Sequence, residues 1–237
     1  MQFLWNELFY NPLYNALVFL ISAVPWHDVG LAVIILTLVV KLILFPLSKK
    51  SIISQVKMKK LDPELKKIKE NFKDKQEQAK KTMALYKENK INPFSGFLLI
   101  LIQLPIIFAL YFVFFKGLSF NENILFSFIK VPQDINFNFL GLIDMHSKSL
   151  FLGILAGLTQ FIQTKISIQA AKPDSADKSF KGELMKSMHL QMKYVLPVFI
   201  GFVAYQISAA VALYWVTSNI FTIGQELFVV RKIRAES

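Results

Sequence analysis

Lys41 is the strongest candidate for a functional side chain, because its ammonium group lies inside the apolar run TLVVKLILFP, residues 37–46. A charged side chain at membrane depth is costly, so such residues usually face a helix-bundle interior or a water-filled cavity. The surrounding apolar residues contribute roughly −6 kcal/mol to insertion, against about +3 kcal/mol for a central lysine. We therefore expect this segment to enter a membrane together with its lysine.

Two interpretations of Lys41 remain open at this point. Lys41 lies eight residues before Lys49, or about 12 Å from the predicted cytoplasmic end, and a lysine stem could cover part of that distance by snorkelling. Alternatively, Lys41 faces a hydrated cavity within the bundle and attracts a polar or acidic partner. Thr37 lies one helical turn earlier and would share that face.

Polar residues on other apolar segments favour the cavity. They stand at matching depth in the predicted spans, and they are Gln103, Gln160, Gln163, Trp215, Ser218, Asn219 and Thr222. Each alone is more typical of an interhelical hydrogen bond, but together they predict a polar groove. Beyond the boundary residues the spans hold one carboxylate, Glu226, near a cytoplasmic end. Water is therefore the expected companion of Lys41.

Long apolar runs set the fold class. The chain of 237 residues is 54% hydrophobic, with a mean hydropathy of +0.45, whereas a soluble domain holds roughly 45–50% apolar residues. A spanning helix needs about 20 apolar residues, and five segments qualify: 28–48, 93–116, 149–169, 193–207 and 208–229. The last two divide one apolar block that is too long for a single crossing. The sequence predicts an all-α integral membrane protein with five transmembrane helices.

The distribution of charge predicts the topology. Lysines and arginines are concentrated in the segment 49–92, in the loop 170–192 and in the short basic tail 230–237. By the positive-inside rule these three segments are cytoplasmic. With five spans, the loop 117–148 and the segment 1–27 then lie outside. We expect a multi-pass protein of the cell (inner or plasma) membrane, with its N-terminus outside and its C-terminus in the cytoplasm.

The segment 1–27 lacks the basic start and small-residue cleavage site of a secretory signal. Asn11 followed by Pro12 is a typical helix start, with asparagine as the cap. A helix from there to Val24 would be about 20 Å long, too short to span a membrane. Because Asn15 and Ser22 fall near the same face as Asn11, we expect an interfacial helix on the outer leaflet.

The segment 49–92 is predicted to form a cytoplasmic helical hairpin. Leu61, Leu65, Ile68 and Phe72 recur at helical spacing, and a second arm follows a turn near residues 71–74. Asp62-Pro63-Glu64 is a helix-start signal inside the first arm, so a kink is expected there. The apolar seam is thin, so we expect the hairpin to move relative to the bundle.

Several function classes are excluded by what the sequence lacks. It has no cysteine, three scattered histidines and no glycine-rich phosphate motif, so we predict no metal site, no cofactor and no nucleotide hydrolysis. The spans contain no nucleophile with a histidine or acidic partner, so an enzyme is not expected. A small transporter or channel with Lys41 as an anion site remains the alternative, although the internal repeats typical of transporters are absent from the sequence.

Seven stretches resemble the YidC-type membrane protein insertase family, whose relatives include the Oxa and Alb proteins. They occur in family order: GLAVIILTLVVKLILFPLSKK, KMKKLDPELKKIKE, MALYKENKINPFSG, LIQLPIIFALY, LAGLTQFIQTK, QMKYVLPV and LYWVTSN. The resemblance implies five core helices around a hydrophilic groove that opens to the cytoplasm and the lipid. It also implies a short form of the family, without the large extracytoplasmic domain of some members.

The resemblance assigns roles to individual residues. Lys41 occupies the position of the family's groove arginine, and Gln103 and Trp215 match further groove-lining positions. Together with the other polar residues, the predicted client-binding groove comprises Lys41, Thr37, Gln103, Trp215, Ser218, Asn219 and Gln160. Two departures affect helix geometry: Leu99 replaces a frequent proline, and residues 208–210 replace a Pro-x-Gly turn.

The resemblance also implies the partners. Nascent membrane proteins would be the clients, received in the groove and released sideways into the lipid, either by the protein alone or with the Sec translocon. The basic hairpin would meet membrane lipids and the ribosome or signal recognition machinery. No specific binding of nucleic acid is expected.

Overall fold

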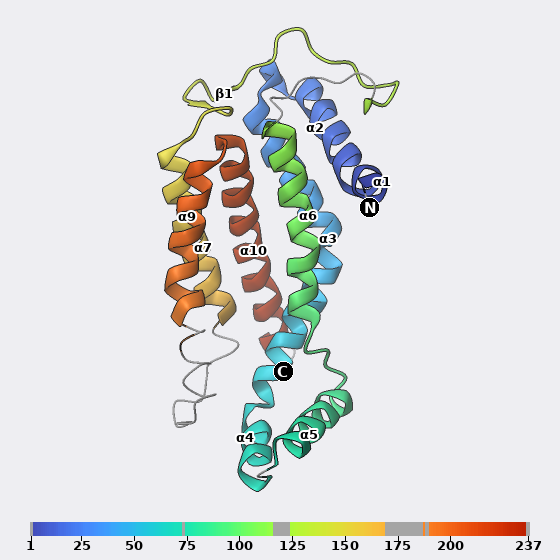
Figure 1. Cartoon of the computed structure of the whole chain (residues 1–237), viewed down its shortest axis with the longest axis vertical. Helices are drawn as coiled ribbons and strands as arrows, with labels where there is room; N and C mark the ends of the chain where they lie inside the picture. The colour runs from blue at the N-terminus through green and yellow to red at the C-terminus, as the bar shows by residue number, and fades with distance from the viewer. Residues whose placement is uncertain (1, 73, 116–123, 169–186, 188–189, 236–237) are drawn as a thin grey trace.

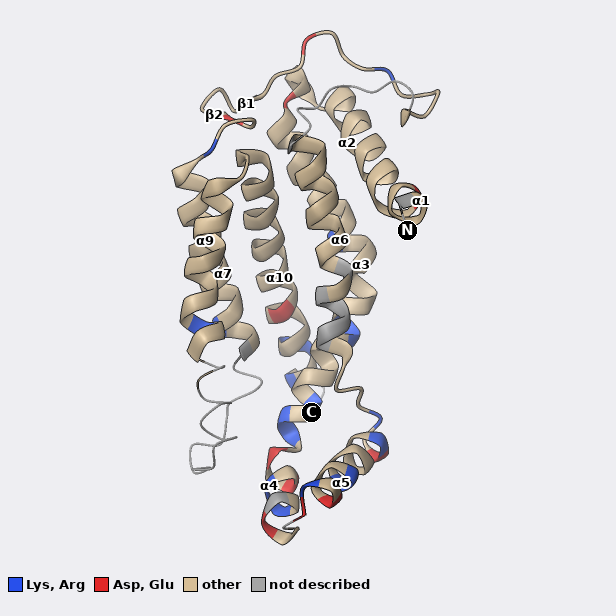
Figure 2. Cartoon of the chain, viewed as in Figure 1, with Lys and Arg blue, Asp and Glu red and all other residues tan. Residues whose placement is uncertain are grey.

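The computed structural model describes residues 2–72, 74–115, 124–168, 187 and 190–235. Its helices stand side by side in an elongated bundle, with a helical hairpin at one end and a looped segment at the other (Figure 1). Lysines and arginines gather on the hairpin and on the ends of the helices nearest to it (Figure 2). The bundle and the charged end are therefore separate parts of the molecule.

Helix α3, Val29–Lys60, extends from the bundle into the charged end. Asp28 begins it, because its Oδ1 atom accepts a hydrogen bond from the N–H of Leu31 at 3.0 Å, which satisfies a free donor of the first turn. The helix continues through Pro46 and past residue 48. The boundary expected at residues 48 and 49 is thus a change from apolar to lysine-rich sequence within one continuous helix.

The charged end consists of two further helices, α4 (Asp62–Asn71) and α5 (Lys75–Glu88). Pro63 lies in the first turn of α4, where its missing N–H is tolerated. A kink was expected here, and the structure instead ends α3 at Lys60 and begins α4 at Asp62. Asp74 caps α5 by accepting the N–H of Gln76 at 3.1 Å, and the turn lies between the two helices, near the position predicted from the sequence.

The remaining helices of the bundle are α6 (Ser95–Phe115), α7 (Leu150–Ile168), α9 (Leu196–Gln206) and α10 (Ala209–Ala235). A π-helical turn, Gln191–Val195, leads into α9. The last apolar block breaks at Ile207, whose backbone is extended, next to Ser208. By length and hydropathy, Val29–Lys60 and Leu150–Ser167 could each cross a membrane, and Gln103–Phe114 is a shorter apolar helix. The arrangement of five spans stays a prediction.

The N-terminal helix differs from the prediction at its start. Helix α1 (Gln2–Trp5) leads through a π-helical turn (Asn6–Tyr10) into α2 (Asn11–Ala23). Asn11 has helical dihedral angles and donates to Glu7 Oε1 at 3.2 Å, so its prediction as a helix cap is wrong. The wider π turn immediately precedes Pro12, whose ring would clash with a regular turn and which has no N–H to donate.

Asn15 of α2 is buried, although the sequence placed it on the polar face of an interfacial helix. It is 1% exposed and donates to the carbonyl of Ile124 at 2.8 Å. Its Oδ1 atom accepts the N–H of Phe126 at 2.7 Å. Tyr14 and Leu17 of the same helix belong to the main hydrophobic core. Helix α2 thus packs against the bundle and, through Asn15, forms hydrogen bonds with residues 124–126.

A short β-hairpin in the segment 117–148 is an exception to the all-α prediction. Strands β1 (Asn138–Phe139) and β2 (Ile143–Asp144) pair antiparallel. Leu140 and Gly141 both have positive φ, at 52° and 72°, as a type I′ turn requires. Asp28 Oδ2 accepts the N–H of Leu140 at 3.1 Å, so the residue that starts α3 also holds this hairpin.

Helix α10 packs against α3 and against α7, and α7 packs in turn against α9. The contact between α7 and α9 is made by glycines. A Cβ atom added to Gly157 would lie 3.1 Å from the carbonyl oxygen of Pro197, and one added to Gly201 would lie 3.1 Å from the carbonyl oxygen of Gly153. Small residues permit this close approach of two backbones, a common feature of helix pairs in membranes.

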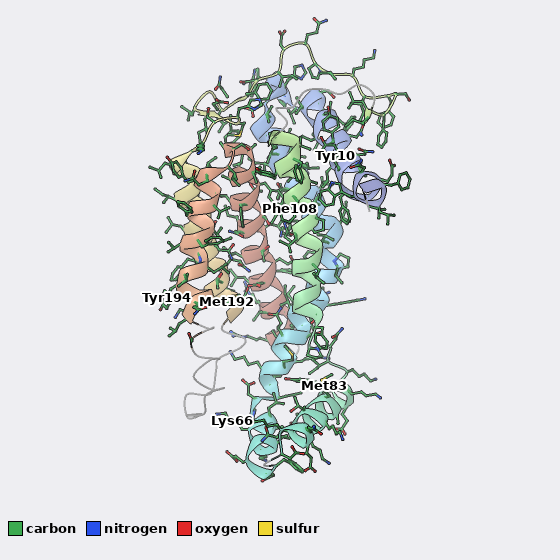
Figure 3. All side chains as sticks on the ribbon, viewed as in Figure 1. Tyr10, Lys66, Met83, Phe108, Met192 and Tyr194 are labelled. Carbon is green, nitrogen blue, oxygen red and sulfur yellow. The ribbon has the colours of Figure 1, made fainter. Side chains whose placement is uncertain are left out.

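The outer surface of the bundle is apolar. Phe108 of α6 is 51% exposed, and Met192 and Tyr194 before α9 are also exposed (Figure 3). Further exposed large side chains include Leu42, Ile43, Phe151, Val198 and Phe228. Exposed apolar surface of this extent marks a membrane or protein contact, and its distribution around the bundle fits lipid.

Candidate functional site around Lys41

Lys41 links three helices through its ammonium group. Its Nζ atom donates to Oε1 of Gln103 on α6 at 3.4 Å and to Oγ1 of Thr222 on α10 at 3.2 Å. Lys41 itself comes from α3 and is only partly buried. Both acceptors are neutral oxygen atoms, so the sequence analysis was incomplete in leaving the ammonium to water. The hydrogen bonds place a cation, with its charge uncompensated by these partners, between α3, α6 and α10.

Tyr214 extends this group of polar side chains. Gln103 donates through Nε2 to the hydroxyl of Tyr214, while its Oε1 atom accepts from Lys41. The amide of Gln103 is therefore oriented by a donor on one side and an acceptor on the other. Tyr214 is 2% exposed, and the sequence analysis did not single it out, although it precedes Trp215 in LYWVTSN. We call Lys41, Gln103, Tyr214 and Thr222 the Lys41 cluster.

Thr37, Ser218 and Trp215 lie on the same helices as members of this cluster. Thr37 is fully buried, and its hydroxyl donates to the carbonyl of Val33 on its own helix at 2.6 Å. Ser218 is also buried, and its carbonyl accepts the hydroxyl of Thr222 at 2.8 Å. Trp215 is partly buried and packs against the hydrophobic core. The hydrogen bonds join Lys41 directly to only one of the predicted groove residues, Gln103.

Asn219 and Gln160 belong to a second polar group, between α10 and α7. Asn219 donates to Oγ1 of Thr159 at 3.2 Å. Gln160 donates to Gln163 Oε1 at 2.9 Å and to Thr164 Oγ1 at 3.1 Å, both on its own helix. The predicted groove residues are therefore divided between two sides of α10. Residues on this second side include Ser167 and Glu226, which are hydrogen-bonded to each other.

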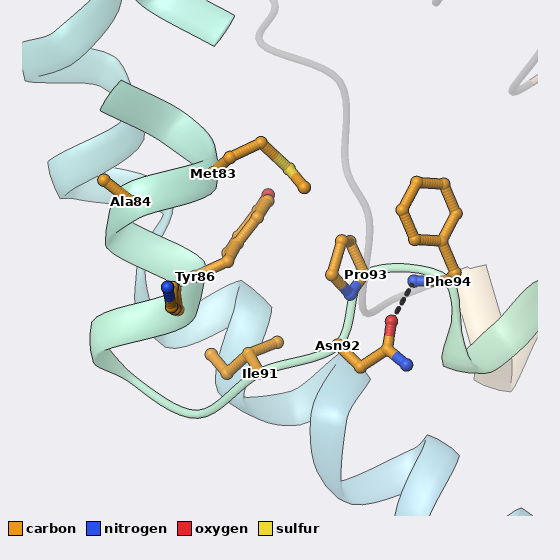
Figure 4. Close-up of a pocket in the computed structure, with 8 residues that line it drawn as sticks. Met83, Ala84, Tyr86, Ile91, Asn92, Pro93 and Phe94 are labelled. Atoms are coloured by element: carbon orange, nitrogen blue, oxygen red, sulfur yellow. Dashed lines mark hydrogen bonds between the residues drawn. The ribbon is translucent and has the colours of Figure 1, made fainter. Parts of the chain in front are cut away.

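A cavity of about 410 Å³ lies where the charged end joins the bundle. Met83, Tyr86, Ile91 and Phe94 are among its lining residues (Figure 4). Burial and the nearby negative charge of Asp62 raise the pKa of Tyr86 above its usual value of 10.0, so its phenol is neutral under physiological conditions. The cavity is thus apolar in character, with lysines on the helix that forms its wall.

Comparison with known proteins identifies the family. A sequence model described as 60Kd inner membrane protein matches residues 19–236. The chain belongs to the 60Kd inner membrane protein family. The family resemblance predicted from the sequence is thereby confirmed.

Within the 60Kd inner membrane protein family, two similar proteins named membrane protein insertase YidC match this chain over most of their length. That of Fusobacterium nucleatum is 35% identical over 226 residues, which cover 94% of this chain and 97% of the relative. That of Oceanobacillus iheyensis is 33% identical over 239 residues, which cover 98% of this chain and 86% of the relative.

Longer members of the 60Kd inner membrane protein family match over part of their length. The YidC insertase of Francisella tularensis subsp. novicida is 35% identical over 207 residues, which cover 87% of this chain and 33% of that protein. The crystal structure of an active YidC insertase, with its first transmembrane domain resolved, has a TM-score of 0.56 at 21% identity. The likeness covers 93% of this chain and 45% of that one, and it shows a shared fold.

Proposed function

We propose that the chain is a membrane protein insertase that acts without covalent chemistry. Its relatives named membrane protein insertase YidC, matched along nearly the whole chain, support this function. Its clients would be small or nascent membrane proteins, and its location the inner or plasma membrane, as the family description suggests. An insertase needs a path for polar segments, and the Lys41 cluster supplies the chemistry for one.

The bundle is proposed to cross the membrane five times. The apolar outer surface of the bundle faces lipid, while the lysine-rich hairpin stays in the cytoplasm together with the C-terminus (Figure 2). Lysine-rich segments resist transfer across the membrane and set the orientation. The β-hairpin and α2 then lie on the outer side. In this orientation Lys41 stands between the outer end of α3 and the cytoplasmic surface.

The observation that carries the mechanism is the pair of neutral partners on Lys41. Hydrogen bonds from an ammonium to neutral oxygens leave its charge uncompensated, whereas a carboxylate would form a stronger, charge-assisted bond. An acidic residue of a client can therefore displace Gln103 or Thr222 from Lys41 with a gain in free energy. The displaced amide and hydroxyl remain able to bond to water or to the client backbone. The site holds an anionic group transiently, because lysine grips a carboxylate as a point charge.

Hydration completes the proposed path. Each unsatisfied polar group of a client in hydrocarbon costs several kcal/mol. A groove lined by Lys41, Thr37, Gln103, Trp215 and Ser218 would keep those groups bonded part-way across the membrane. Between α10 and α7 the proposed groove extends to Asn219 and Gln160. The apolar helix of the client leaves sideways into lipid, and burial of its apolar surface drives the transfer forward.

The partners of the hairpin follow from its charge. Residues 49–90 hold fourteen lysines against six acidic residues, which attracts anionic lipid head groups and acidic protein segments. We propose that this segment meets the ribosome or signal recognition machinery, and that the bundle works alone or beside the Sec translocon. The cavity beside Met83 lies at the junction where a client would pass from the hairpin to the groove (Figure 4).

The proposal is tested by reconstituting the protein in liposomes and measuring protease-protected insertion of a single-span client with an acidic translocated tail. We expect Lys41→Ala to slow insertion about tenfold or more, the size of one charge-assisted hydrogen bond. Lys41→Arg should retain most activity, and Gln103→Ala should lose part of it. Lys165→Ala removes an exposed lysine of α7 and serves as the matched control.

Three results would contradict parts of the proposal. If Lys41→Ala inserts the client as fast as wild type, the lysine is not the attracting group and the groove works by hydration alone. If Lys165→Ala slows insertion equally, the effect is one of net charge. If wild type inserts no more client than empty liposomes but conducts anions, the chain is a transporter or channel with Lys41 at its anion site.

A further inference from the structure

A directed chain of hydrogen bonds runs along α7 and ends on α10. Gln160 Nε2 donates to Gln163 Oε1 at 2.9 Å, and Gln163 Nε2 donates to Ser167 Oγ at 3.1 Å. Ser167 Oγ donates to Glu226 Oε1 at 2.5 Å. All donors point toward the carboxylate, so these hydrogen bonds favour its charged form, whereas burial of the group favours its neutral form.

Glu226 retains one free oxygen atom. The residue is 8% exposed, and its Oε2 atom is buried without a hydrogen-bond partner in the part of the chain that the structure describes. A buried carboxylate oxygen without a donor is costly. Such an atom requires a donor from outside the described residues, which water, an ion or a bound ligand can supply. The ligand must be a hydrogen-bond donor, and a cationic donor would in addition offset the cost of ionising this buried carboxyl group.

The position of Glu226 relative to Lys41 suggests the source of that cation. Thr222, which binds Lys41, and Glu226 are four residues apart on α10, so Glu226 lies about one helical turn further along the axis, on the side of α10 that faces α7. Glu226 is the nearer of the two to the C-terminal end of α10, which is the cytoplasmic end in the proposed topology. A client would therefore meet a carboxylate first and an ammonium one turn deeper.

We propose that Glu226 is a second client-binding position, which takes the ammonium or guanidinium group of a client's basic flank. The inference rests on the insertase function proposed above and specifies a second chemical feature of the clients. Membrane segments carry their lysines and arginines on the cytoplasmic side, and Glu226 stands at that side. A client with an acidic translocated tail and a basic cytoplasmic flank would contact Lys41 and Glu226 with opposite charges. Lys41 and Glu226 together thus favour binding of the client in one orientation, with its acidic tail toward Lys41 and its basic flank toward Glu226.

The test uses two clients that share an acidic tail and differ in one flanking residue, lysine or glutamine. The rate of protected insertion is measured for both in proteoliposomes with wild type, Glu226→Gln, Glu226→Asp and the control Glu70→Gln, which removes an exposed carboxylate of α4. The ratio of the two rates reports the contribution of Glu226. Insertion of the glutamine client by wild type, compared with empty liposomes, reports insertase function separately.

Wild type should insert the lysine client about five- to tenfold faster than the glutamine client, as expected for a charge-assisted hydrogen bond. Glu226→Gln should bring this ratio close to one, Glu226→Asp should keep part of it, and Glu70→Gln should keep all of it. A ratio that is unchanged in Glu226→Gln overturns the inference.

A cross-linking measurement covers the case in which Glu226→Gln is unstable. Since the chain has no cysteine, Glu226→Cys and the exposed neighbour Leu227→Cys introduce single thiols. A client with a cysteine beside its basic flank should form a disulfide at position 226 several times more often than at position 227. Equal yields at both positions contradict a defined contact with Glu226. If wild type inserts neither the lysine client nor the glutamine client, the proposed insertase function itself is contradicted.

Discussion

The glycine contact between α7 and α9 offers the sharpest test of the packing. A Cβ atom on Gly201 would lie 3.1 Å from the carbonyl oxygen of Gly153 and 3.3 Å from the Cα atom of Gly157. Both neighbours are backbone atoms, so they cannot rotate away, and the helices must separate by a few tenths of an ångström. A Cβ atom on Gly224 of α10 would meet nothing within 4 Å. Gly201→Ala and Gly224→Ala therefore add the same methyl group to a crowded site and to an open one.

The expected magnitudes follow from two opposing contributions. Replacing a helical glycine with alanine stabilises a helix by about 0.5–1 kcal/mol, and at Gly224 nothing opposes this gain. Overpacking a close contact costs about 1–3 kcal/mol, so Gly201→Ala should lower the free energy of unfolding by about 1 kcal/mol. Gly157→Ala together with Gly201→Ala places two methyl groups in one contact, and the loss should exceed the sum of the single variants.

The assay is thermal unfolding of purified variants in one detergent, followed by intrinsic tryptophan fluorescence and by monomer recovery in size-exclusion chromatography. At about 2–4 °C per kcal/mol for a chain of this size, Gly201→Ala should lower the midpoint by about 3 °C, and the double variant should lower it further. Gly224→Ala should raise the midpoint or leave it unchanged. A Gly201→Ala variant as stable as Gly224→Ala would refute the close approach of α7 and α9.

Three further predictions concern the end of the bundle that carries α2 and the β-hairpin. Asn15→Leu should lower the free energy of unfolding by about 1–3 kcal/mol, because the carbonyl of Ile124 and the N–H of Phe126 lose their bonds to this buried side chain, and limited proteolysis should cut this loop faster. Asp28→Ala should cost about 2 kcal/mol, roughly half for the helix cap and half for the bond to the β-hairpin, measured as a lower thermal midpoint. Hydrogen bonds from the hydroxyl of Ser147 and from the backbone lower the pKa of Asp144 below its usual 3.8. The ionised carboxylate therefore stabilises the folded turn above pH 3.8, and this stabilisation is lost as the pH falls through the lowered pKa. Hydrogen exchange in this turn should therefore accelerate below about pH 3.8 relative to neutral pH after correction for intrinsic rates, and Asp144→Asn should remove that dependence.

The helix boundaries could be predicted where a physical limit applies. The apolar block that begins at Tyr194 exceeds the length of one membrane crossing, so a break was required, and the structure has it at Ile207, although neither glycine nor proline marks it. The start of the N-terminal helix could not be predicted in the same way. Asn11 and Pro12 are typical of a helix start, but a π-helical turn admits the proline within a continuous helix.

The sequence predicts how deep each candidate site residue lies along its helix, but not toward which neighbouring helix its side chain points. An apolar span fixes the height of Lys41 and Gln103, and the two are hydrogen-bonded in the structure. The same reasoning grouped Asn219 with them, yet it bonds across to α7. Rotation of each helix about its axis depends on packing against its neighbours, which one sequence does not reveal. Tyr214 was missed for the same reason, because a tyrosine in an apolar run gives no sign of its partner.

The central claim is that clients move along the groove beside Lys41 rather than over the outer surface of the bundle. Disulfide cross-linking of an insertion intermediate tests it directly, since the chain has no native cysteine. Ser218→Cys places a thiol at a predicted groove position, and Val198→Cys places one on the exposed face of α9. With a single cysteine in the client's polar translocated segment, we expect the adduct at position 218 to exceed that at position 198 several-fold. Equal adducts, or a preference for position 198, would contradict a path through the groove.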